Sequence, residues 1–424
     1  MSEFEKNTAS AAILVGIAEN TSALDSLSRS LDELTRLLET AGGSAFARVV
    51  QVKDRPDART YIGSGKVREI KDLAANHEIG LVIFDVELTP SQIQNLEEDI
   101  GEVTVIDRTM LILDIFALHA GSGEGKLQVE LAQLRYTAPR LTGKGSELSR
   151  LGGGIGTRGP GESQLERDRR HMKQRIHALE EQIAEMEKNR SVMRAARDRS
   201  GIPKIAIVGY TNAGKSTLLN RLTDAGVLAE DKLFATLDPT TRRLELPESE
   251  SVLLTDTVGF IRKLPHHLVK AFKSTLEEAV HADILMIVAD ATDDECDEHL
   301  DVTLGLLDEL GASGKPTVLV YNKSDLPNAR ARKEYRDMSA VISCSAATGE
   351  GIDDLFSALL AIIRAGKREL TLVFPYTAQS KVSALYDAAE VLSVEYENDG
   401  IRIRAILDAQ AQGAYRAFVQ ESDR

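Results

Sequence analysis

The stretch KIAIVGYTNAGKSTLLNRLT, residues 204–223, decides the fold of this chain. It opens with the apolar run KIAIV, which is typical of a buried strand, and closes with STLLNRLT, which has helical periodicity. Between them Gly209-Tyr210-Thr211-Asn212-Ala213-Gly214-Lys215-Ser216 fits the pattern G-x-x-x-x-G-K-[ST]. Because a strand, a glycine loop and a helix follow one another in that order, we expect an α/β domain with a phosphate-binding loop.

The residue types of this loop suit phosphate. Its glycines allow backbone N–H groups to wrap around phosphate oxygens, and the following helix adds the positive end of its dipole. The Lys215 ammonium should reach the β- and γ-phosphates, and the Ser216 hydroxyl should bind Mg²⁺. Thr217, at the start of the helix, is included among the expected nucleotide contacts. A chance glycine turn is the alternative.

A second motif, Asp256-Thr257-Val258-Gly259, follows the apolar strand SVLLT. An Asp at a strand end can hold Mg²⁺ through water, and the Gly259 N–H can approach the γ-phosphate. The alternative is a structural Asp at the turn after a strand.

A third motif, Asn322-Lys323-Ser324-Asp325, follows the strand PTVLVY. The Asp325 carboxylate can accept hydrogen bonds from guanine N1–H and the 2-amino group, which adenine lacks. Lys323 can pack its stem across the base, and Asn322 can brace the loop. Ser345-Ala346 ends the strand VISC, where a backbone N–H can meet guanine O6. Each motif is weak alone, but their order and strand-end spacing together predict guanine binding.

The loop between the first two motifs is expected to act as a switch. A hydroxyl there should complete Mg²⁺ coordination when the γ-phosphate is present. Thr236 is the expected ligand and Thr240 the alternative. The expected catalytic groups are Lys215, Thr236 and Gly259. The expected nucleotide contacts in this loop are Phe234, Ala235, Thr236, Leu237 and Asp238.

Phe260 departs from the common pattern of small GTPases, many of which place a Gln directly after D-T-V-G to orient the attacking water. A phenyl ring cannot orient water, so hydrolysis needs help from a partner or a monovalent cation. Asn212 stands where related GTPases use an Asn to bind potassium. A purely structural loop residue is the alternative at that position.

The rest of the chain predicts further elements. Residues 11–107 alternate strand and helix signals, which indicates a parallel α/β sheet. Two helical segments then follow, joined by a glycine-rich stretch, and indicate an antiparallel coiled-coil hairpin with a flexible tip. The apolar positions of its rhythm are Leu127, Leu131, Leu134, Leu165, Met172, Ile176, Leu179, Ile183, Met186 and Met193. Residues after about 369 read as three short strands around a helix.

The distribution of charge along the chain indicates which kind of partner the protein can bind. The formal net charge of −15 by itself argues against nucleic acid. Residues 140–200, however, hold fourteen Lys or Arg against nine Asp or Glu, a local +5, so the remainder carries about −20. A basic segment inside an acidic chain predicts one specialised contact surface.

Other features of the sequence argue against metal sites, membrane spans and a second nucleotide site. Cys296 and Cys344 cannot form a disulfide scaffold or a four-cysteine zinc site, which fits a reducing cytosol. No apolar run approaches the ~20 residues that span a bilayer, and the first apolar run reads as a strand rather than a signal peptide. Gly63–Lys66 faintly resembles a phosphate loop, with a tight turn into a helix as the favoured alternative. His266-His267 reads as a solvated pair.

Taken together, the motifs resemble the HflX family of the Obg-HflX group of translation-factor-class GTPases. GYTNAGKS, FATLDPTT, DTVGF and NKSD support the class. The long segments YIGSGKVREI, VIFDVELTPSQIQNLE, VIDRTMLILDIFALHA, KLQVELAQLRYTAPRL and GGIGTRGPGESQLERDRR support the particular family over nearly the whole chain. The family often has Arg and Pro where Tyr210 and Thr211 stand here, and neither change alters the backbone that binds phosphate.

The resemblance implies a GTPase that binds GTP and GDP with Mg²⁺, contacts the 50S ribosomal subunit and its rRNA, and separates stalled or idle 70S ribosomes. We expect a cytoplasmic monomer with an N-terminal α/β domain at 1–115, a helical hairpin at 116–200, a P-loop G domain at 201–366 and a small α+β appendage at 367–424. Two alternatives are a nucleotide-gated ribosome-binding module and an ATP-dependent RNA remodeller that uses the N-terminal domain.

Overall fold

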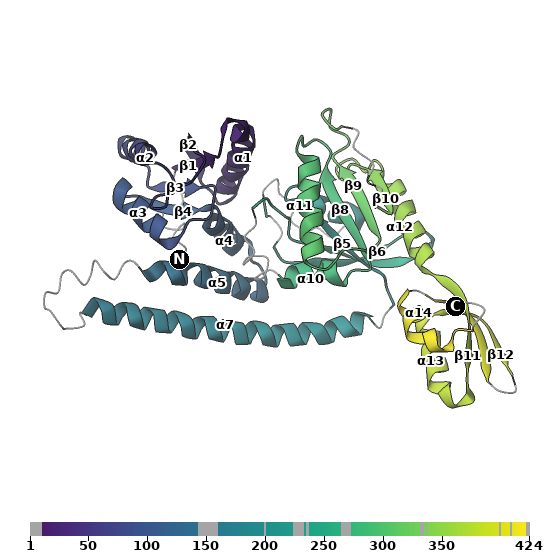
Figure 1. Ribbon diagram of the computed structural model, residues 1–424. Helices are drawn as coiled ribbons and strands as arrows, with labels where there is room; N and C mark the ends of the chain where they lie inside the picture. The colour runs from purple at the N-terminus through teal and green to yellow at the C-terminus, as the bar shows by residue number, and fades with distance from the viewer. Residues whose placement is uncertain are drawn as a thin grey trace. The chain divides into compact units, whose positions relative to one another are not determined.

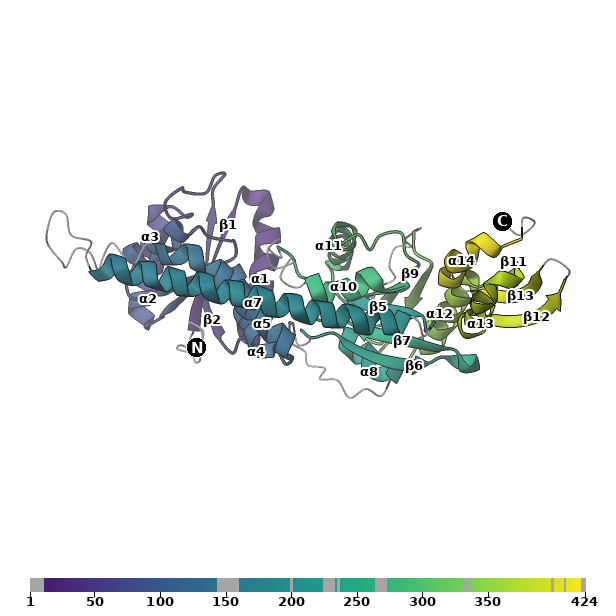
Figure 2. The same ribbon diagram turned by 90° about the horizontal axis from the view of Figure 1, so that it is seen from below.

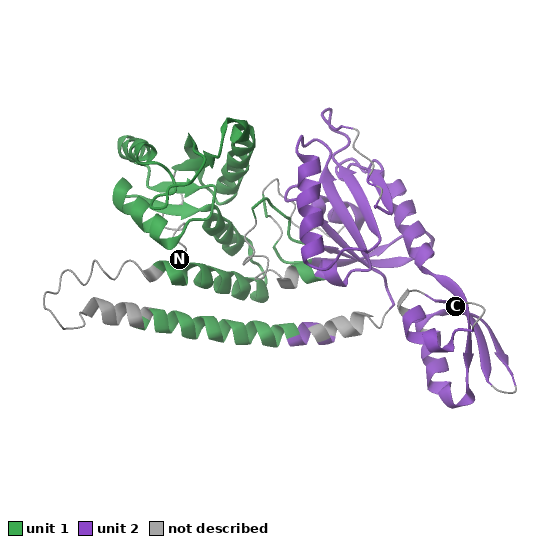
Figure 3. Ribbon diagram, in the orientation of Figure 1, with its two compact units in different colours: residues 1–187, 228–239, 257–277 green, residues 188–227, 240–256, 278–424 purple. Residues whose placement is uncertain are grey.

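The computed structural model describes residues 11–142, 160–198, 201–223, 233–234, 237–263, 273–330, 335, 337–397, 400–407 and 409–420. The chain forms two compact units (Figure 3). The first contains residues 1–187, 228–239 and 257–277, and the second contains 188–227, 240–256 and 278–424. Two segments of the expected G domain therefore group with the N-terminal part, while the bounds of the four expected domains stay a prediction.

The first unit is built on a four-stranded parallel sheet, as its alternating pattern predicted. The strand order is β2-β1-β3-β4. Every residue of β3 is buried, because helices cover both faces of a parallel sheet. The strands are β1 (Ala11–Ala18), β2 (Ser44–Val52), β3 (Leu81–Phe84) and β4 (Thr104–Asp107).

Four helices pack around this sheet, with α1 on one side and α2 and α3 on the other (Figures 1 and 2). They are α1 (Leu24–Thr40), α2 (Ser64–His77), α3 (Pro90–Ile100) and α4 (Arg108–His119). Thr89 begins α3 with a capping box and a proline in the first turn. The residue that ends α2 is Glu78, which has a left-handed backbone.

Two further helices, α5 (Gly123–Thr137) and α7 (Pro160–Asp198), run side by side (Figures 1 and 2). Ion pairs Arg175–Glu130 and Arg135–Glu180, both at 2.6 Å, join them. Of the expected seam, Leu131 and Leu179 are buried whereas Met186 is 36% exposed. The two helices form a hairpin, and its glycine-rich tip lies outside the described residues.

The second unit contains a six-stranded sheet of order β10-β9-β8-β5-β7-β6. All neighbours are parallel except β6 and β7, which are antiparallel. Four of its strands match the expected apolar runs, but β6 was not expected. The strands are β5 (Lys204–Gly209), β6 (Thr240–Glu245), β7 (Ser251–Asp256), β8 (Ile284–Asp290), β9 (Thr317–Asn322) and β10 (Ala340–Ser343).

The helices of this sheet are α8 (Lys215–Thr223), α10 (Lys273–His281), α11 (Cys296–Glu309) and α12 (Ile352–Gly366). The apolar stripes of α8 and α12 share one core with the central strands. The loops that follow β5, β7, β8 and β9 leave the same edge of the sheet, because parallel strands end together, and ligands bind at that edge in open α/β sheets.

The C-terminal part of this unit is a three-stranded antiparallel sheet of order β11-β13-β12, with two helices. Its elements are β11 (Arg368–Phe374), α13 (Gln379–Ala388), β12 (Glu390–Tyr396), β13 (Ile401–Leu407) and α14 (Ala409–Tyr415). The expected mixed α/β fold with a P-loop domain, a helical segment and a small α+β part is confirmed. Among the described residues, none of the helices combines the length and apolarity needed to cross a bilayer.

Candidate nucleotide site

Two glycines shape the phosphate loop between β5 and α8. Gly209 has a φ of +148°, and a Cβ there would lie 2.2 Å from the Val288 carbonyl oxygen. Gly214 has a φ of +92°, and a Cβ there would lie 2.2 Å from the Asn322 amide nitrogen. Both positions therefore exclude every side chain, for reasons of backbone conformation and of space. The motif glycines are needed by the packing as well as by the ligand.

Lys215 opens α8 and is only 6% exposed. Its Nζ donates to the Tyr210 carbonyl at 2.8 Å, so the lysine closes the loop on itself. Burial lowers the pKa of Lys215 to about 8, with the nearby Asp256 carboxylate opposing that shift. An ammonium held against the backbone of a glycine loop suits a phosphate ligand.

Ser216 and Asp256 come together although 40 residues separate them. The Ser216 hydroxyl donates to the Asp256 carboxylate at 2.6 Å. Asp256 ends β7 and is completely buried, which places one hydroxyl and one carboxylate beside the phosphate loop. Oxygen donors of this kind, completed by water and phosphate oxygens, fit Mg²⁺.

Asn322 links the three expected binding loops. Its side-chain nitrogen donates to the Ala213 carbonyl, and its side-chain oxygen accepts from the Ala346 backbone N–H, both at 2.9 Å. The residue is 2% exposed and ends β9. One amide therefore ties the phosphate loop, the N-K-x-D loop and the Ser345-Ala346 loop into a single arrangement.

Hydrogen bonds fix two further residues of the N-K-x-D loop, Lys323 and Ser324, and leave Asp325 exposed. Lys323 has a left-handed backbone, with φ at +65°, and its Nζ donates to Asp290 at 2.6 Å. The Ser324 N–H donates to the Cys344 carbonyl at 3.1 Å. Asp325 is exposed. Asp290 was not expected from the sequence; its place at the end of β8 is the signal that could have identified it.

Ser345 and Ala346 are buried beside the same loop. The Ser345 hydroxyl accepts from the Thr348 N–H at 3.0 Å. Arg221, which the sequence analysis missed, donates from Nε to the Ala346 carbonyl at 3.0 Å and also contacts the Ala347 carbonyl. These bonds fix the direction of the backbone N–H groups in the loop.

Comparison with known proteins agrees with this geometry. Three family models match in succession: GTP-binding GTPase N-terminal at residues 28–117, GTP-binding GTPase Middle Region at 119–197, and 50S ribosome-binding GTPase at 204–323. GTPase HflX of Lacrimispora saccharolytica is 49% identical over 93% of this chain and 93% of its own length. The chain belongs to the HflX family of GTPases.

Other known proteins are similar to this chain over most of their length. GTPase HflX of Escherichia coli is 42% identical, covering 87% of both chains. The solved structure of a GTP-binding protein from Sulfolobus solfataricus in complex with GDP is 28% identical, covers 83% of this chain and 98% of its own, and has a TM-score of 0.44. The expected resemblance to the HflX family and the expected GTPase activity are both confirmed.

Several expected contacts of this HflX-family chain belong to the first unit. Phe234, Leu237, Val258 and Phe260 are all 5% exposed or less. The first unit also contains Asp238, Thr257 and Gly259. Ala235 and Thr236 lie outside the described residues, so the expected Mg²⁺ ligand of the switch loop stays a prediction.

Thr240, the alternative switch ligand, is the first residue of β6 and pairs with Asp256 across the sheet. It therefore belongs to a strand and not to a loop. Asn212 has a left-handed backbone with φ at +63°, and its potassium role stays a prediction. Tyr210 stacks on His299 with ring centroids 3.7 Å apart. Thr211 is 7% exposed, and Thr217 is exposed at the surface of α8.

The faint N-terminal phosphate-loop pattern forms the start of a helix. Gly63 is the N-cap of α2 and donates its N–H to Gln51. Lys66 pairs with Glu69 one turn later, at 2.7 Å. This is the tight turn into a helix that was the favoured alternative. His266 and His267 lie outside the described residues.

Proposed function

We propose that this chain is a cytoplasmic, Mg²⁺-dependent GTPase that binds the 50S ribosomal subunit and promotes the splitting of stalled or idle 70S ribosomes. The observation that carries the nucleotide part is the pair of hydrogen bonds at Asn322, one donated to Ala213 and one accepted from Ala346, which joins the phosphate loop to the expected guanine loops. The ribosomal part rests on family membership and on the match to the 50S ribosome-binding GTPase model.

In this proposal, different residues of the second unit bind different parts of the nucleotide. Lys215 and the loop amides bind the phosphates, and Ser216 with Asp256 holds Mg²⁺, which neutralises phosphate charge when bound. Asp325 reads the guanine edge, and the backbone N–H of Ala346 meets O6. Gly259 and Thr236 complete the site when the γ-phosphate is present.

The hairpin supplies the proposed contact to RNA. Residues 140–200 carry a local charge of +5, and the described arginines Arg167, Arg169 and Arg170 on α7 are exposed. Guanidinium groups bind phosphate through several donors in one plane. Since the rest of the chain is acidic, this basic surface has to provide the attraction to the ribosome.

Two alternative functions make different predictions from this proposal. A nucleotide-gated binding module would contact the 50S subunit in a GTP-dependent way without stimulated turnover, and Phe260 in place of a water-orienting Gln keeps that reading open. An ATP-dependent RNA remodeller would need a nucleotide site in the N-terminal domain. Because Gly63 and Lys66 form an ordinary helix start, they provide no support for it.

The experiment is sedimentation of 70S ribosomes through a sucrose gradient with the protein and either GDP or a non-hydrolysable GTP analogue. The proposal expects the 70S peak to decrease and the subunit peaks to increase only with the analogue. The Lys215→Met variant is the matched control and should leave 70S ribosomes intact. Intact 70S ribosomes with the unaltered protein and the analogue would overturn the splitting function.

A further inference from the structure

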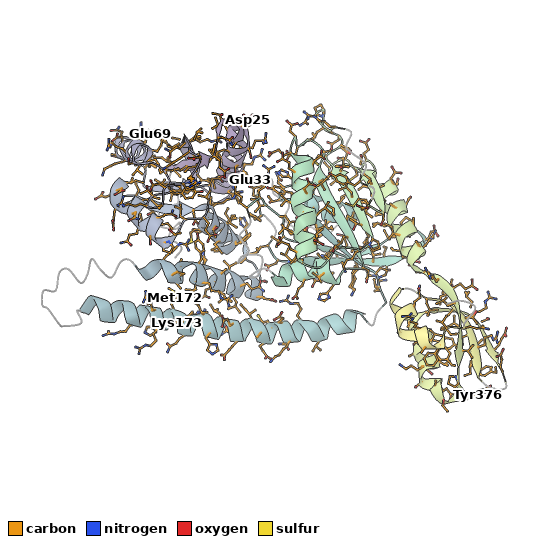
Figure 4. All side chains as sticks on the ribbon, in the orientation of Figure 1. Asp25, Glu33, Glu69, Met172, Lys173 and Tyr376 are labelled. Carbon is orange, nitrogen blue, oxygen red and sulfur yellow. The ribbon has the colours of Figure 1, made fainter. Side chains whose placement is uncertain are left out.

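One aromatic stack holds the phosphate loop from the side of α11. The Tyr210 ring lies almost parallel to the His299 imidazole, with 11° between the planes and 3.7 Å between the centroids. Tyr210 is 7% exposed and the His299 side chain 13%, so both are largely removed from water. His299 is on α11, which lies beside the sheet of the second unit (Figures 1 and 4). Because stacked rings attract each other, this contact fixes the direction of the Tyr210 side chain.

The backbone carbonyl of Tyr210 organises the phosphate loop. It accepts from the Lys215 Nζ at 2.8 Å and from the Ala213 N–H at 3.3 Å. Lys215 is the residue expected to bind the β-phosphate. Because one carbonyl holds both donors, a shift of Tyr210 changes the loop backbone and the direction of the Lys215 ammonium together.

His299 is itself fixed by a carboxylate. Its Nδ1 lies 3.2 Å from a carboxylate oxygen of Asp293. A carboxylate only accepts hydrogen bonds, so this contact favours a proton on Nδ1 and sets the orientation of the imidazole. The other Asp293 oxygen accepts from the Glu295 N–H at 2.9 Å, and the Asp293 carbonyl accepts from the Cys296 N–H at 3.2 Å, where α11 begins. The position of the carboxylate is therefore set by the start of the same helix.

The loop that precedes α11 also contacts the base end of the site. Asp290 accepts from the Lys323 ammonium at 2.6 Å, and the Ala291 N–H donates to the Asn322 carbonyl at 2.9 Å. Both partners belong to the N-K-x-D loop. His299 is therefore held in a fixed position relative to the loop expected to bind guanine, and its stack fixes the phosphate loop relative to the same frame.

We propose that His299 is a positioning residue of the nucleotide site and acts through the Tyr210 ring on the loop that binds the β-phosphate. The inference rests on the proposed nucleotide site. GDP and GMP share the base and the α-phosphate, and only GDP offers a β-phosphate to Lys215. The ratio of their dissociation constants therefore reports the contribution of the phosphate loop. A stack that served packing alone would change stability and leave this ratio as it is.

The test measures the dissociation constants of GDP and GMP for His299→Leu and Tyr210→Leu. Each variant should lower GDP affinity relative to GMP affinity by about two- to tenfold, the range that one aromatic pair accounts for. The double variant should lose no more than either single variant, because both remove the same stack. An unchanged ratio in both single variants overturns the proposal. A loss in the double variant that equals the product of the two single losses also overturns it.

Two further variants separate positioning from a loss of stability. Tyr210→Phe keeps the ring and should bind GDP more tightly than Tyr210→Leu, whereas equal losses would assign the effect to the hydroxyl and refute the stack. Leu307→Val shortens a buried side chain about two turns later on α11 and should leave the ratio unchanged while the thermal midpoint falls. A ratio that falls as far as in His299→Leu would make the effect one of packing.

Lys215→Met distinguishes failure of the site from failure of the inference. If this variant binds GDP as tightly as the parent chain, the proposed nucleotide site is wrong, and the role of His299 is wrong with it. If it binds weakly while both leucine variants keep the parent ratio, only the positioning role is wrong. These assays omit ribosomal subunits, so their outcome does not depend on 50S binding.

A measurement on the parent chain needs no substitution and remains decisive if a variant fails to fold. Nuclear Overhauser effects between the ring protons of His299 and Tyr210 should be present in the GDP complex, since the rings lie 3.7 Å apart. Their absence would show that the stack does not exist with nucleotide bound and would overturn the proposal.

Discussion

At the scale of single residues, Lys215 shows what burial does to a phosphate-binding group. Its pKa is lowered to about 8 from an ordinary value of 10.5 because the ammonium is desolvated. The site therefore loses this charge as pH rises through 8. Since the unfolded chain keeps the proton up to about pH 10.5, the folded chain gains stability as pH rises between 8 and 10.5.

The expected consequence is a pH-dependent nucleotide affinity. Only the charged lysine attracts phosphate, so the GDP dissociation constant should stay level below pH 8 and rise above it, by at most about tenfold per pH unit. Fluorescence titration at pH 7, 8 and 9 measures this. Lys215→Met should bind weakly without the slope. A constant affinity up to pH 9 in the parent chain would contradict the shifted pKa.

Asp325 carries the second residue-scale prediction. It is exposed in the N-K-x-D loop that Asn322 and Lys323 hold in place. Asp325→Asn replaces an acceptor by a donor, so GTP affinity should fall by a factor of ten or more, roughly 1.4 kcal/mol, and xanthine nucleotides should bind instead. Competition titration with GTP and XTP is the measurement, and unchanged GTP binding would sink the assignment.

At the scale of elements, two described apolar side chains of α7 differ in burial. Leu179 of α7 is completely buried, whereas Met186, two turns later, is 36% exposed. Leu179→Ala should therefore destabilise the first unit by about 2–4 kcal/mol. Met186→Ala is the matched control and should cost far less. Equal shifts in the thermal midpoints of the two variants would show that α7 does not pack as described.

The basic tip of the hairpin is the second prediction at this scale, although Arg150 and Arg158 lie outside the described residues. Replacing both by Glu should weaken co-sedimentation with 50S subunits, with a reduced dependence on salt, and leave GTP affinity nearly intact. The same charge change at Lys381 and Arg416, exposed residues of the C-terminal part, is the control. Unaltered 50S binding at every salt concentration would make the hairpin a structural spacer.

At the scale of the whole molecule, slow hydrolysis in isolation is the central expectation. Phe260 is 1% exposed and has no group that could position water, so a partner has to supply that function. Phosphate release should increase by an order of magnitude or more when 50S subunits are added. Equal rates with and without subunits would favour a binding module with incidental hydrolysis.

The same assay tests the potassium hypothesis. Asn212 stands in the phosphate loop with a left-handed backbone, φ +63°. If its side chain binds potassium, release of phosphate in KCl should exceed release in NaCl at equal ionic strength. Asn212→Ala should abolish the difference. If the two salts act alike on the parent chain, Asn212 is a structural residue of the loop.

The sequence by itself determined the features that depend on neighbouring residues. The phosphate loop, the capping box at Thr89 and the strands β5, β7, β8 and β9 follow from local patterns, because glycine conformations, caps and hydrophobic periods involve residues that are close in the chain. The order of the motifs also predicted which loops share the carboxyl edge of the sheet, and Asn322 and Ala346 meet there.

Only the tertiary structure decided the features that depend on distant partners. Strand β6 has no alternating pattern, with only Leu244 buried, and exists because β7 offers it an antiparallel edge. Lys323 needs Asp290, and Asp85 collects Lys263 and Arg108 from far along the chain. No local signal records such pairs, since their free energy comes from contacts that form only when the chain has folded.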